Sequence, residues 1–144
     1  AQESRGLGDV YKRQIRYCVE HGIPIIATCR GMQYINVLYG GKLSYHPELP
    51  VDRPRGKDHR VHLLTENRDI YVNNFHQDVI FEDRLAPCFT PMAIDEENHV
   101  VEAYYSEKVK LLALQWHPER QFETGEAEEE TRRIIVNFIQ KYIH

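Results

Sequence analysis

The sequence predicts an α/β fold with a mainly parallel sheet between helices, a three-layer arrangement. A helical segment ending at Gly22 leads into the apolar run at residues 23–28, and a sharp turn at Cys29 leads into a second helix. A short, almost wholly apolar run is typical of a strand buried on both faces, as in a parallel sheet covered by helices. The order helix, buried strand, turn, helix is that of an α/β unit.

The flanking helices are expected at residues 11–21 and 30–39. Gly22 and the pair Gly40–Gly41 supply the left-handed position that ends each helix. Residues 44–58 hold three prolines and a glycine, which predicts a loop long enough to have a function. Strands are then expected at residues 59–64, 70–72, 89–94, 100–105 and 110–115, with a hairpin turn at residues 95–98.

The last segment is predicted to be an amphipathic helix. Four glutamates at residues 126–130 precede its apolar stripe and Lys141 follows, which complements the helix dipole. The stripe consists of Ile134, Ile135, Phe138, Ile139 and Tyr142.

Composition limits the class of protein. The 144 residues are 42% hydrophobic and 28% charged, which fits one soluble globular domain. A net charge of -4 without a basic tract argues against nucleic acid as a partner. The three cysteines form no CxxC pair, so we expect reduced thiols in the cytoplasm rather than disulfides. No apolar run reaches the length of a membrane span, so no membrane partner is expected.

Residues 1–14 need a separate interpretation. The segment Asp9-Val-Tyr-Lys-Arg-Gln14 resembles the translation of a transposon-end adapter used in sequencing-library preparation, which predicts that residues 1–14 are a scar. The alternative is a genuine helix start, because Tyr11, Ile15, Cys18 and Val19 fall on one helical face.

Cys29 is the candidate nucleophile because it lies at a strand-to-helix turn flanked by the small residues Ala27 and Gly31. Such a turn holds a nucleophile tightly, often in a strained conformation. The helix start points free N–H groups at the sulfur, which favours the thiolate, and the N–H of Arg30 can donate to an oxyanion. Cys18 and Cys88 lack such a turn and are expected to be structural.

His117 and Glu119 are the candidate base and orienting carboxylate. They follow another apolar strand, and sites in open α/β sheets form at the carboxyl ends of strands. Pro118 keeps His117 extended, so His117 and Glu119 can project to the same side. A cysteine nucleophile needs a base, and the base needs a partner that fixes its tautomer. The alternative is a strand-end histidine beside a surface charge.

No metal or cofactor is expected. The zinc-deaminase interpretation of His-Pro-Glu fails because no Pro-Cys-x-x-Cys follows. His59 and His62 are three residues apart on a predicted strand, so they should face opposite sides and make a poor metal pair.

The run from Pro24 to Gly41 resembles the nucleophile motif of class I glutamine amidotransferases, and Cys29-Arg-Gly-Met-Gln33 resembles the γ-glutamyl-γ-aminobutyrate hydrolase branch, the C26 peptidase-like hydrolases. Val72-Asn-Asn-Phe-His76 is similar to the Val-Asn-Ser-x-His segment of that branch, and Leu114-Gln-Trp-His-Pro-Glu119 matches its histidine motif. The resemblance covers residues 15–144 and implies a flavodoxin-like class I glutamine amidotransferase fold.

The resemblance also implies roles for residues. Cys29 would form a γ-glutamyl thioester, His117 would carry the proton, Glu119 would orient His117, and the Arg30 N–H would make half of the oxyanion hole. The substrate contacts implied are Gln33, the backbone around Asn73, Asn74 and Phe75, and His76.

Three departures from the family pattern stand out. Ala27 replaces the usual first glycine of Gly-x-Cys-x-Gly and crowds the turn, and Asn74 replaces serine. In the family the cysteine motif follows several strands and helices, including a glycine-rich segment that supplies the second oxyanion N–H. We therefore expect a chain truncated at its N-terminus, with weak or no activity in isolation.

The resemblance favours a stand-alone hydrolase acting on γ-glutamyl amides of small amines, such as γ-glutamyl-γ-aminobutyrate. Two alternatives stay open: a glutaminase that supplies ammonia to a synthetase partner, and a γ-glutamyl hydrolase acting on a nucleotide-linked substrate. A non-catalytic binding relative is a further alternative. The sequence leaves a homodimer open as well.

Overall fold

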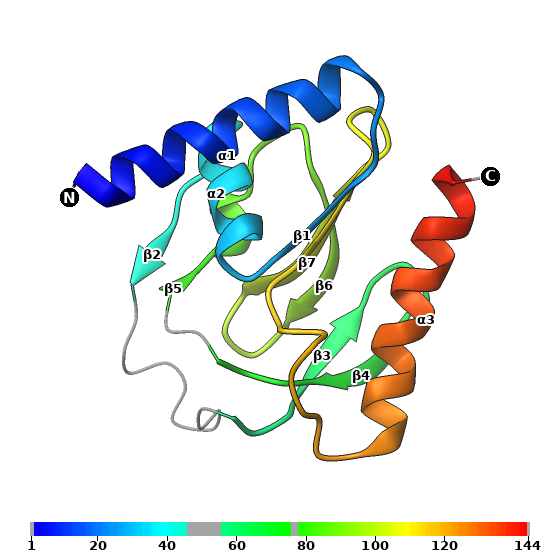
Figure 1. The fold of residues 1–144 in the computed structure, drawn as a ribbon. Coiled ribbons are helices and arrows are strands. Elements are labelled where there is room, and N and C mark those ends of the chain that lie inside the picture. The colour runs from blue at the N-terminus through cyan, green and yellow to red at the C-terminus, as the bar shows by residue number, and fades with distance from the viewer. Residues whose placement is uncertain (1, 46–55, 76–77, 144) are drawn as a thin grey trace.

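The computed structural model describes residues 2–45, 56–75 and 78–143, with side chains from Gly8 onward (Figure 1). The helices are α1 (Gln2–Glu20), α2 (Arg30–Leu38) and α3 (Gly125–Tyr142), with a 3-10 turn η1 (Glu82–Arg84). The strands are β1 (Ile25–Thr28), β2 (Ser44–Tyr45), β3 (His59–Leu63), β4 (Arg68–Val72), β5 (Asp78–Val79), β6 (Thr90–Asp95), β7 (Val100–Ser106) and β8 (Leu111–Leu114). The helices and longer strands occur where the sequence predicts them.

The main sheet has six strands in the order β1-β8-β7-β6-β3-β4, and β2 pairs with β5 separately. β1 and β8 are parallel, whereas the other neighbouring pairs of the main sheet are antiparallel. The described strands are thus less parallel than the sequence predicts. The reason is local: hairpins ending at Asn67, His99 and Lys110, all with positive φ, join β3 to β4, β6 to β7 and β7 to β8, and a short hairpin permits only antiparallel pairing.

Alternate residues of β8 contribute to two separate cores, which gives the predicted three layers. Leu112 and Leu114 pack in a cluster with Ala127 and Ile134 of α3. Leu111 and Ala113 belong to a second cluster with Met32 and Ile35 of α2. Because successive side chains of a strand point to opposite faces, α3 covers one face of the sheet and α2 the other.

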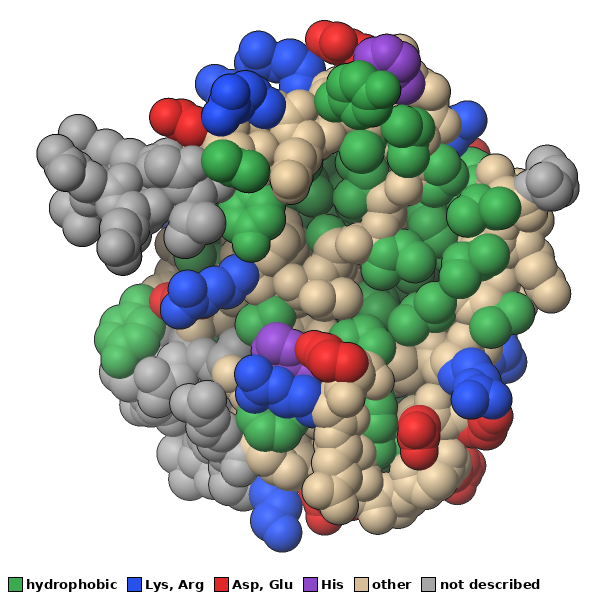
Figure 2. Space-filling view, in the orientation of Figure 1, with side chains coloured by type: hydrophobic (Ala, Val, Ile, Leu, Met, Phe, Trp, Pro, Cys, Tyr) green, Lys and Arg blue, Asp and Glu red, His purple; other side chains and the backbone are tan. Residues whose placement is uncertain are grey.

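β1 is the first strand of the sheet, and this corrects one prediction. Its burial was expected on both faces, but Ile26 is 40% exposed and only Ala27 is buried. β1 pairs with β8 alone, so its other edge has no neighbouring strand among the described residues. Figure 2 shows hydrophobic side chains at the surface in the region between α1 and α3.

The N-terminal helix is longer than predicted. α1 runs from Gln2 rather than from about residue 11, and the Tyr34 hydroxyl donates to the Gly8 carbonyl at 2.7 Å. The helix ends at Glu20, and Gly22, whose φ is +65°, supplies the expected left-handed position just after it. Whether residues 1–14 are a scar stays a prediction. None of the described helices is both long and apolar enough to cross a membrane.

The predicted loop at residues 44–58 is only partly described. Ser44 and Tyr45 form β2 against β5, a pairing that the sequence did not predict, because two-residue strands have no periodicity to detect. Residues 46–55 lie outside the described part of the chain.

Candidate active site

Cys29 occupies a strained turn between β1 and α2. Its φ of 49° and ψ of -107° are unusual for a residue with a side chain. Its N–H donates to the Leu114 carbonyl at 2.8 Å, extending the β1–β8 pairing, and its own carbonyl accepts from Gln33 N at 3.1 Å as α2 begins. The strand-to-helix turn predicted at Cys29 is therefore present.

The small residues beside Cys29 fit as expected, with one difference. A Cβ placed on Gly31 would meet the Ala27 Cβ at 3.6 Å, which is ordinary contact. Ala27 itself is buried against α2. The methyl group of Ala27 therefore packs in the core and does not crowd the turn.

The electrostatics of the Cys29 thiol correct a second prediction. Burial raises the pKa of the Cys29 thiol, while the Arg30 backbone N–H and the charges of Arg120 and Arg30 lower it by less. The N–H at the helix start thus lowers the pKa of Cys29 as predicted, but burial is the larger effect and the net shift is upward. A thiol with a raised pKa requires a base before it can act as a nucleophile at neutral pH.

His117 and Glu119 form a close pair, with Nδ1 of His117 2.6 Å from Oε1 of Glu119. Burial alone would raise the pKa of Glu119, but the hydrogen bond from His117, a backbone N–H and the charges of His117 and Arg120 together lower it. Glu119 is therefore held ionised and can accept a hydrogen bond from Nδ1 of His117, while Nε2 lies outside this contact.

The backbone of His117 is held by a residue expected to contact substrate. The Asn73 side chain accepts from His117 N at 3.0 Å and donates to the His117 carbonyl at 2.9 Å. Asn73 is fully buried. The preceding Trp116 donates from its indole to Thr131 of α3 at 3.0 Å. The strand end carrying His117 is thus fixed to both β4 and α3.

Gln33 is placed differently from its implied role. Its amide nitrogen donates to the Asp78 carbonyl and to the Gln115 side chain, each at 3.1 Å, and it is buried. Gln115 in turn points its amide at the Cys29 sulfur, 3.9 Å away. Gln33 therefore supports the cysteine through Gln115 and does not line the cleft. Sequence analysis missed Gln115, although a polar residue closing an apolar strand was a usable signal.

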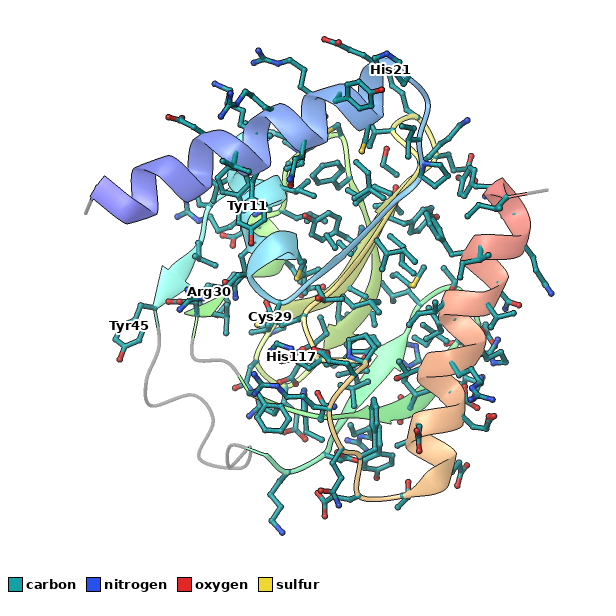
Figure 3. All side chains as sticks on the ribbon, in the orientation of Figure 1. Tyr11, His21, Cys29, Arg30, Tyr45 and His117 are labelled. Atoms are coloured by element: carbon teal, nitrogen blue, oxygen red, sulfur yellow. The ribbon has the colours of Figure 1, made fainter. Side chains whose placement is uncertain are left out.

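Cys29 and His117 line one cleft of about 680 Å³ (Figure 3). They come from the adjacent strands β1 and β8, whose parallel register brings both carboxyl ends to the same edge. Other lining residues include Arg30, Phe75 and Arg120. Of the remaining implied contacts, Asn74 is buried and its carbonyl accepts from Gly56 N, while His76 lies outside the described residues.

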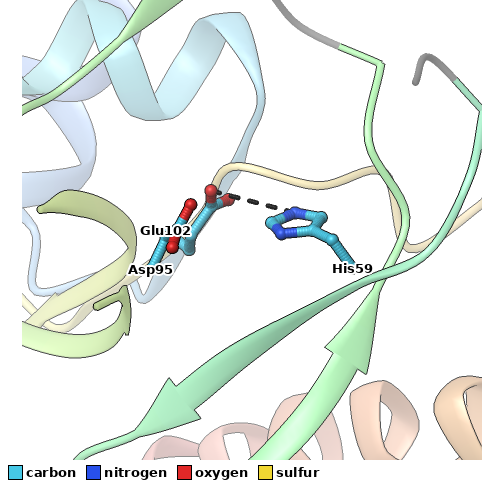
Figure 4. Close-up of side chains that lie close together, drawn as sticks. All are labelled: His59, Asp95 and Glu102. Atoms are coloured by element: carbon cyan, nitrogen blue, oxygen red, sulfur yellow. Dashed lines mark ion pairs between the residues drawn. The ribbon is translucent and has the colours of Figure 1, made fainter. Parts of the chain in front are cut away.

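A second set of titratable groups lies away from this cleft. His59 is buried with Asp95 and Glu102, and its Nε2 is 3.8 Å from Oε1 of Glu102 (Figure 4). His62 lies on the other face of β3 and meets Asp69 at 2.9 Å. The two histidines thus face opposite sides, as predicted, and each sits with carboxylates of its own rather than with the other.

Solved structures define the class of fold. The chain superposes on a GMP synthase-type protein from Thermoplasma acidophilum (TM-score 0.67, 22% identity, covering 92% of this chain and 66% of that one). It also superposes on a glutamine amidotransferase from Thermotoga maritima (TM-score 0.65, 16% identity, 97% and 58%). The fold is therefore that of class I glutamine amidotransferases, as predicted.

Sequence comparison then gives the family. The chain belongs to the Peptidase C26 family, whose model matches residues 9–119. It is 30% identical over 140 residues to the glutamine amidotransferase-like protein YvdE of Lactococcus lactis (85% of this chain, 57% of the relative). It is 28% identical to the gamma-glutamyl-CDP-amidate hydrolase of Campylobacter jejuni (78% and 52%) and 28% identical to the gamma-glutamyl-gamma-aminobutyrate hydrolase PuuD of Escherichia coli (73% and 49%). The chain spans about half the length of these curated relatives.

Proposed function

We propose that the protein is a cysteine-dependent hydrolase of γ-glutamyl amides that works through a γ-glutamyl thioester. The observation that carries this proposal is the shared cleft: a strained Cys29 at the end of β1 and His117 at the end of β8, with Glu119 2.6 Å from the imidazole. A nucleophile, a base and an orienting carboxylate in this order are what acyl transfer by a cysteine requires.

The reaction would proceed in two steps. His117 takes the proton of Cys29, and the thiolate attacks the γ-carbonyl carbon of the substrate. The oxyanion accepts from the Arg30 backbone N–H, which has no partner within the helix because it lies in the first turn of α2. The tetrahedral species expels the amine, which takes the proton from His117, and leaves the thioester. Water, deprotonated by His117, then releases glutamate and restores the thiol.

The family supports a substrate in which a γ-glutamyl group is joined to an amine. Two relatives carry γ-glutamyl substrates in their names, one with γ-aminobutyrate and one with a CDP-amidate. We favour small amines such as γ-aminobutyrate as the leaving group. Glutaminase activity that serves a synthetase partner is the alternative; the fold alone, shared with synthesis-linked proteins, does not favour it over hydrolysis.

A single-turnover hydrolysis assay tests the proposal. With protein in excess over γ-glutamyl-γ-aminobutyrate, we expect release of glutamate and a transient adduct of one glutamyl group on Cys29, seen by intact mass. Cys29→Ser should abolish both, while Cys88→Ser, which changes an exposed thiol outside the cleft, should abolish neither. Hydrolysis that survives Cys29→Ser contradicts the mechanism, and ammonia release from free glutamine alone contradicts the substrate class.

A further inference from the structure

The cleft that holds Cys29 is lined by two arginines, Arg30 and Arg120, and by no carboxylate among its described residues. Within the described part of the chain, neither guanidinium has a carboxylate at ion-pair distance. Five other arginines do have one, namely Arg60, Arg68, Arg84, Arg132 and Arg133, whereas the exposed Arg13 and Arg16 of α1 have none among the described residues. The chain carries 22 acidic against 18 basic residues, so carboxylates are not scarce. The two arginines therefore lie in a cleft that no described carboxylate lines, although the charge of Arg120 also reaches the neighbouring Glu119.

Arg120 is held in position by an aromatic contact. Its Cζ lies 4.7 Å from the centroid of the Phe75 ring, and the Phe75 and His117 rings are nearly perpendicular at a centroid distance of 5.9 Å. A guanidinium stacked on a ring keeps its N–H edges free, and those edges match a carboxylate or a phosphate in a two-pronged contact. Stacking also fixes the rotamer, which lowers the entropy cost of binding an anion.

The position of Arg120 assigns it to the leaving-group side of the site. His117 must reach the nitrogen of the departing amine to protonate it. Arg120 follows His117 by three residues, donates from its backbone N–H to the His117 carbonyl at 3.1 Å, and shares Phe75 with the imidazole. A charged group attached to the departing amine would therefore come close to Arg120. Arg30, the residue after Cys29, lines the same cleft.

We infer that the site prefers γ-glutamyl amides whose leaving amine carries an anionic group, a carboxylate or a phosphate, and that Arg120 is the residue that binds this group. The inference rests on the proposed hydrolase function and sharpens its substrate class. Free glutamine and γ-glutamyl alkylamines leave Arg120 without a partner and are poorer substrates. A charge-assisted hydrogen bond to an anion is expected to contribute about 10- to 100-fold in kcat/KM.

Three substrates with one acyl group test the inference. They are γ-glutamyl-γ-aminobutyrate, γ-glutamyl-phosphoethanolamine and the neutral γ-glutamyl-butylamine. The kcat/KM for hydrolysis of each substrate is measured with wild type, with Arg120→Gln, and with Arg132→Gln as a matched control. Arg132 is an exposed arginine of α3 that pairs only with Glu129 among the described residues and lies outside the cleft.

Wild type should favour at least one anionic substrate over the neutral one by about 10-fold or more. Arg120→Gln should remove that preference, mainly through KM, and Arg132→Gln should keep it. Arg120→Gln also takes a positive charge from the neighbourhood of Cys29, which slows all three substrates alike, so the ratio of anionic to neutral kcat/KM is the decisive quantity. The favoured anion identifies the carboxylate or the phosphate as the group recognised.

The outcomes separate the two claims. The inference is wrong, while the hydrolase function stands, if the neutral amide has the same kcat/KM as the anionic ones. The same holds if Arg120→Gln leaves the ratio of anionic to neutral kcat/KM unchanged. If wild type cleaves none of the three, or if cleavage survives Cys29→Ser, the proposed function itself has failed.

Discussion

Two of the four histidine–glutamate pairs in the described part of the chain, His117–Glu119 and His59–Glu102, lie in contrasting surroundings. The His117–Glu119 pair is close, at 2.6 Å, opens on the cleft of Cys29, and has a Glu119 side chain that is 61% exposed. The His59–Glu102 pair is 3.8 Å apart and sealed, with side chains 6% and 0% exposed. The third group beside His59 and Glu102 is the carboxylate of Asp95, whereas the third group beside His117 and Glu119 is the thiol of Cys29. Similar residue types thus serve different purposes.

The difference teaches that a histidine beside a carboxylate is not sufficient for catalysis. The imidazole of His117 lines the same cleft as the strained Cys29 and the cations Arg30 and Arg120. The pair at residues 59 and 102 ties β3 to β7 across the sheet and has no access to Cys29. We therefore expect substitutions in the first pair to affect chemistry and substitutions in the second to affect stability.

The largest expected effect separates the two histidines. His117→Gln removes the proposed base for a thiol of raised pKa, so hydrolysis of the preferred γ-glutamyl amide should fall by about 10³-fold or more. His59→Gln should change the rate by only a few-fold at a temperature where the variant is folded. Equal losses of kcat in both variants would remove the distinction.

A smaller loss is expected from Glu119→Gln. The carboxamide cannot fix the tautomer or stabilise the imidazolium, but Glu119 is largely exposed and water partly replaces it, so about a 10- to 10³-fold loss of kcat is expected. The pH profile gives a second check. The pKa of Glu119 is lowered in the folded protein, so its hydrogen bond to His117 is present above the ordinary glutamate pKa and is lost as pH falls through the lowered value. An acid limb that is identical in Glu119→Gln would contradict this role.

The buried pair should respond through stability. His59→Ala removes a buried side chain and leaves the Glu102 carboxylate in the interior without that neighbour. The free energy of unfolding should drop by about 2–4 kcal/mol, measured by urea denaturation. Labelling of Cys29 in the folded variant should be unaffected. A variant as stable as wild type would show that the pair does not stabilise the fold.

The smallest effect is expected at His62, on the outer face of the same strand. Its hydrogen bond to Asp69 raises the pKa of His62. The stabilisation is therefore fully present below the ordinary histidine pKa and is lost as pH rises through the raised value. His62→Gln should reduce the difference in Tm between pH 5.5 and pH 8.5, measured by thermal melting. An unchanged difference would assign that pH dependence to other groups.

Much of this arrangement was predictable because its signals are local. A strand that ends at a cysteine before a glycine, and a strand that ends at His-Pro-Glu, place Cys29 and His117 without any knowledge of tertiary contacts. The long strands and the amphipathic α3 were readable from periodicity. Three features were not predictable, because each depends on which segments pack together. They are the exposed edge at Ile26, the β2–β5 pairing and the direction of the Cys29 pKa shift.

The substrate contacts were the weakest part of the prediction for the same reason. Gln33 and Asn73 carry the right residue types, but tertiary packing turns their amides toward Gln115 and the His117 backbone. The importance of Arg120 was not readable from the sequence because it depends on the position of Arg120 in the cleft and on its contact with Phe75. Unpaired charge is visible only in three dimensions.

Site-selective labelling tests the central claim most directly. A glutamine-analogue chloroketone is added to the chain, and the labelled thiol is located by peptide mass analysis in wild type and in His117→Gln. Cys88 is the exposed thiol and Cys29 is partly buried, so simple accessibility favours Cys88. We predict that Cys29 is labelled first and that His117→Gln slows its labelling strongly while leaving Cys88 unchanged. Preferential labelling of Cys88, or Cys29 labelling that is indifferent to His117, would contradict the account.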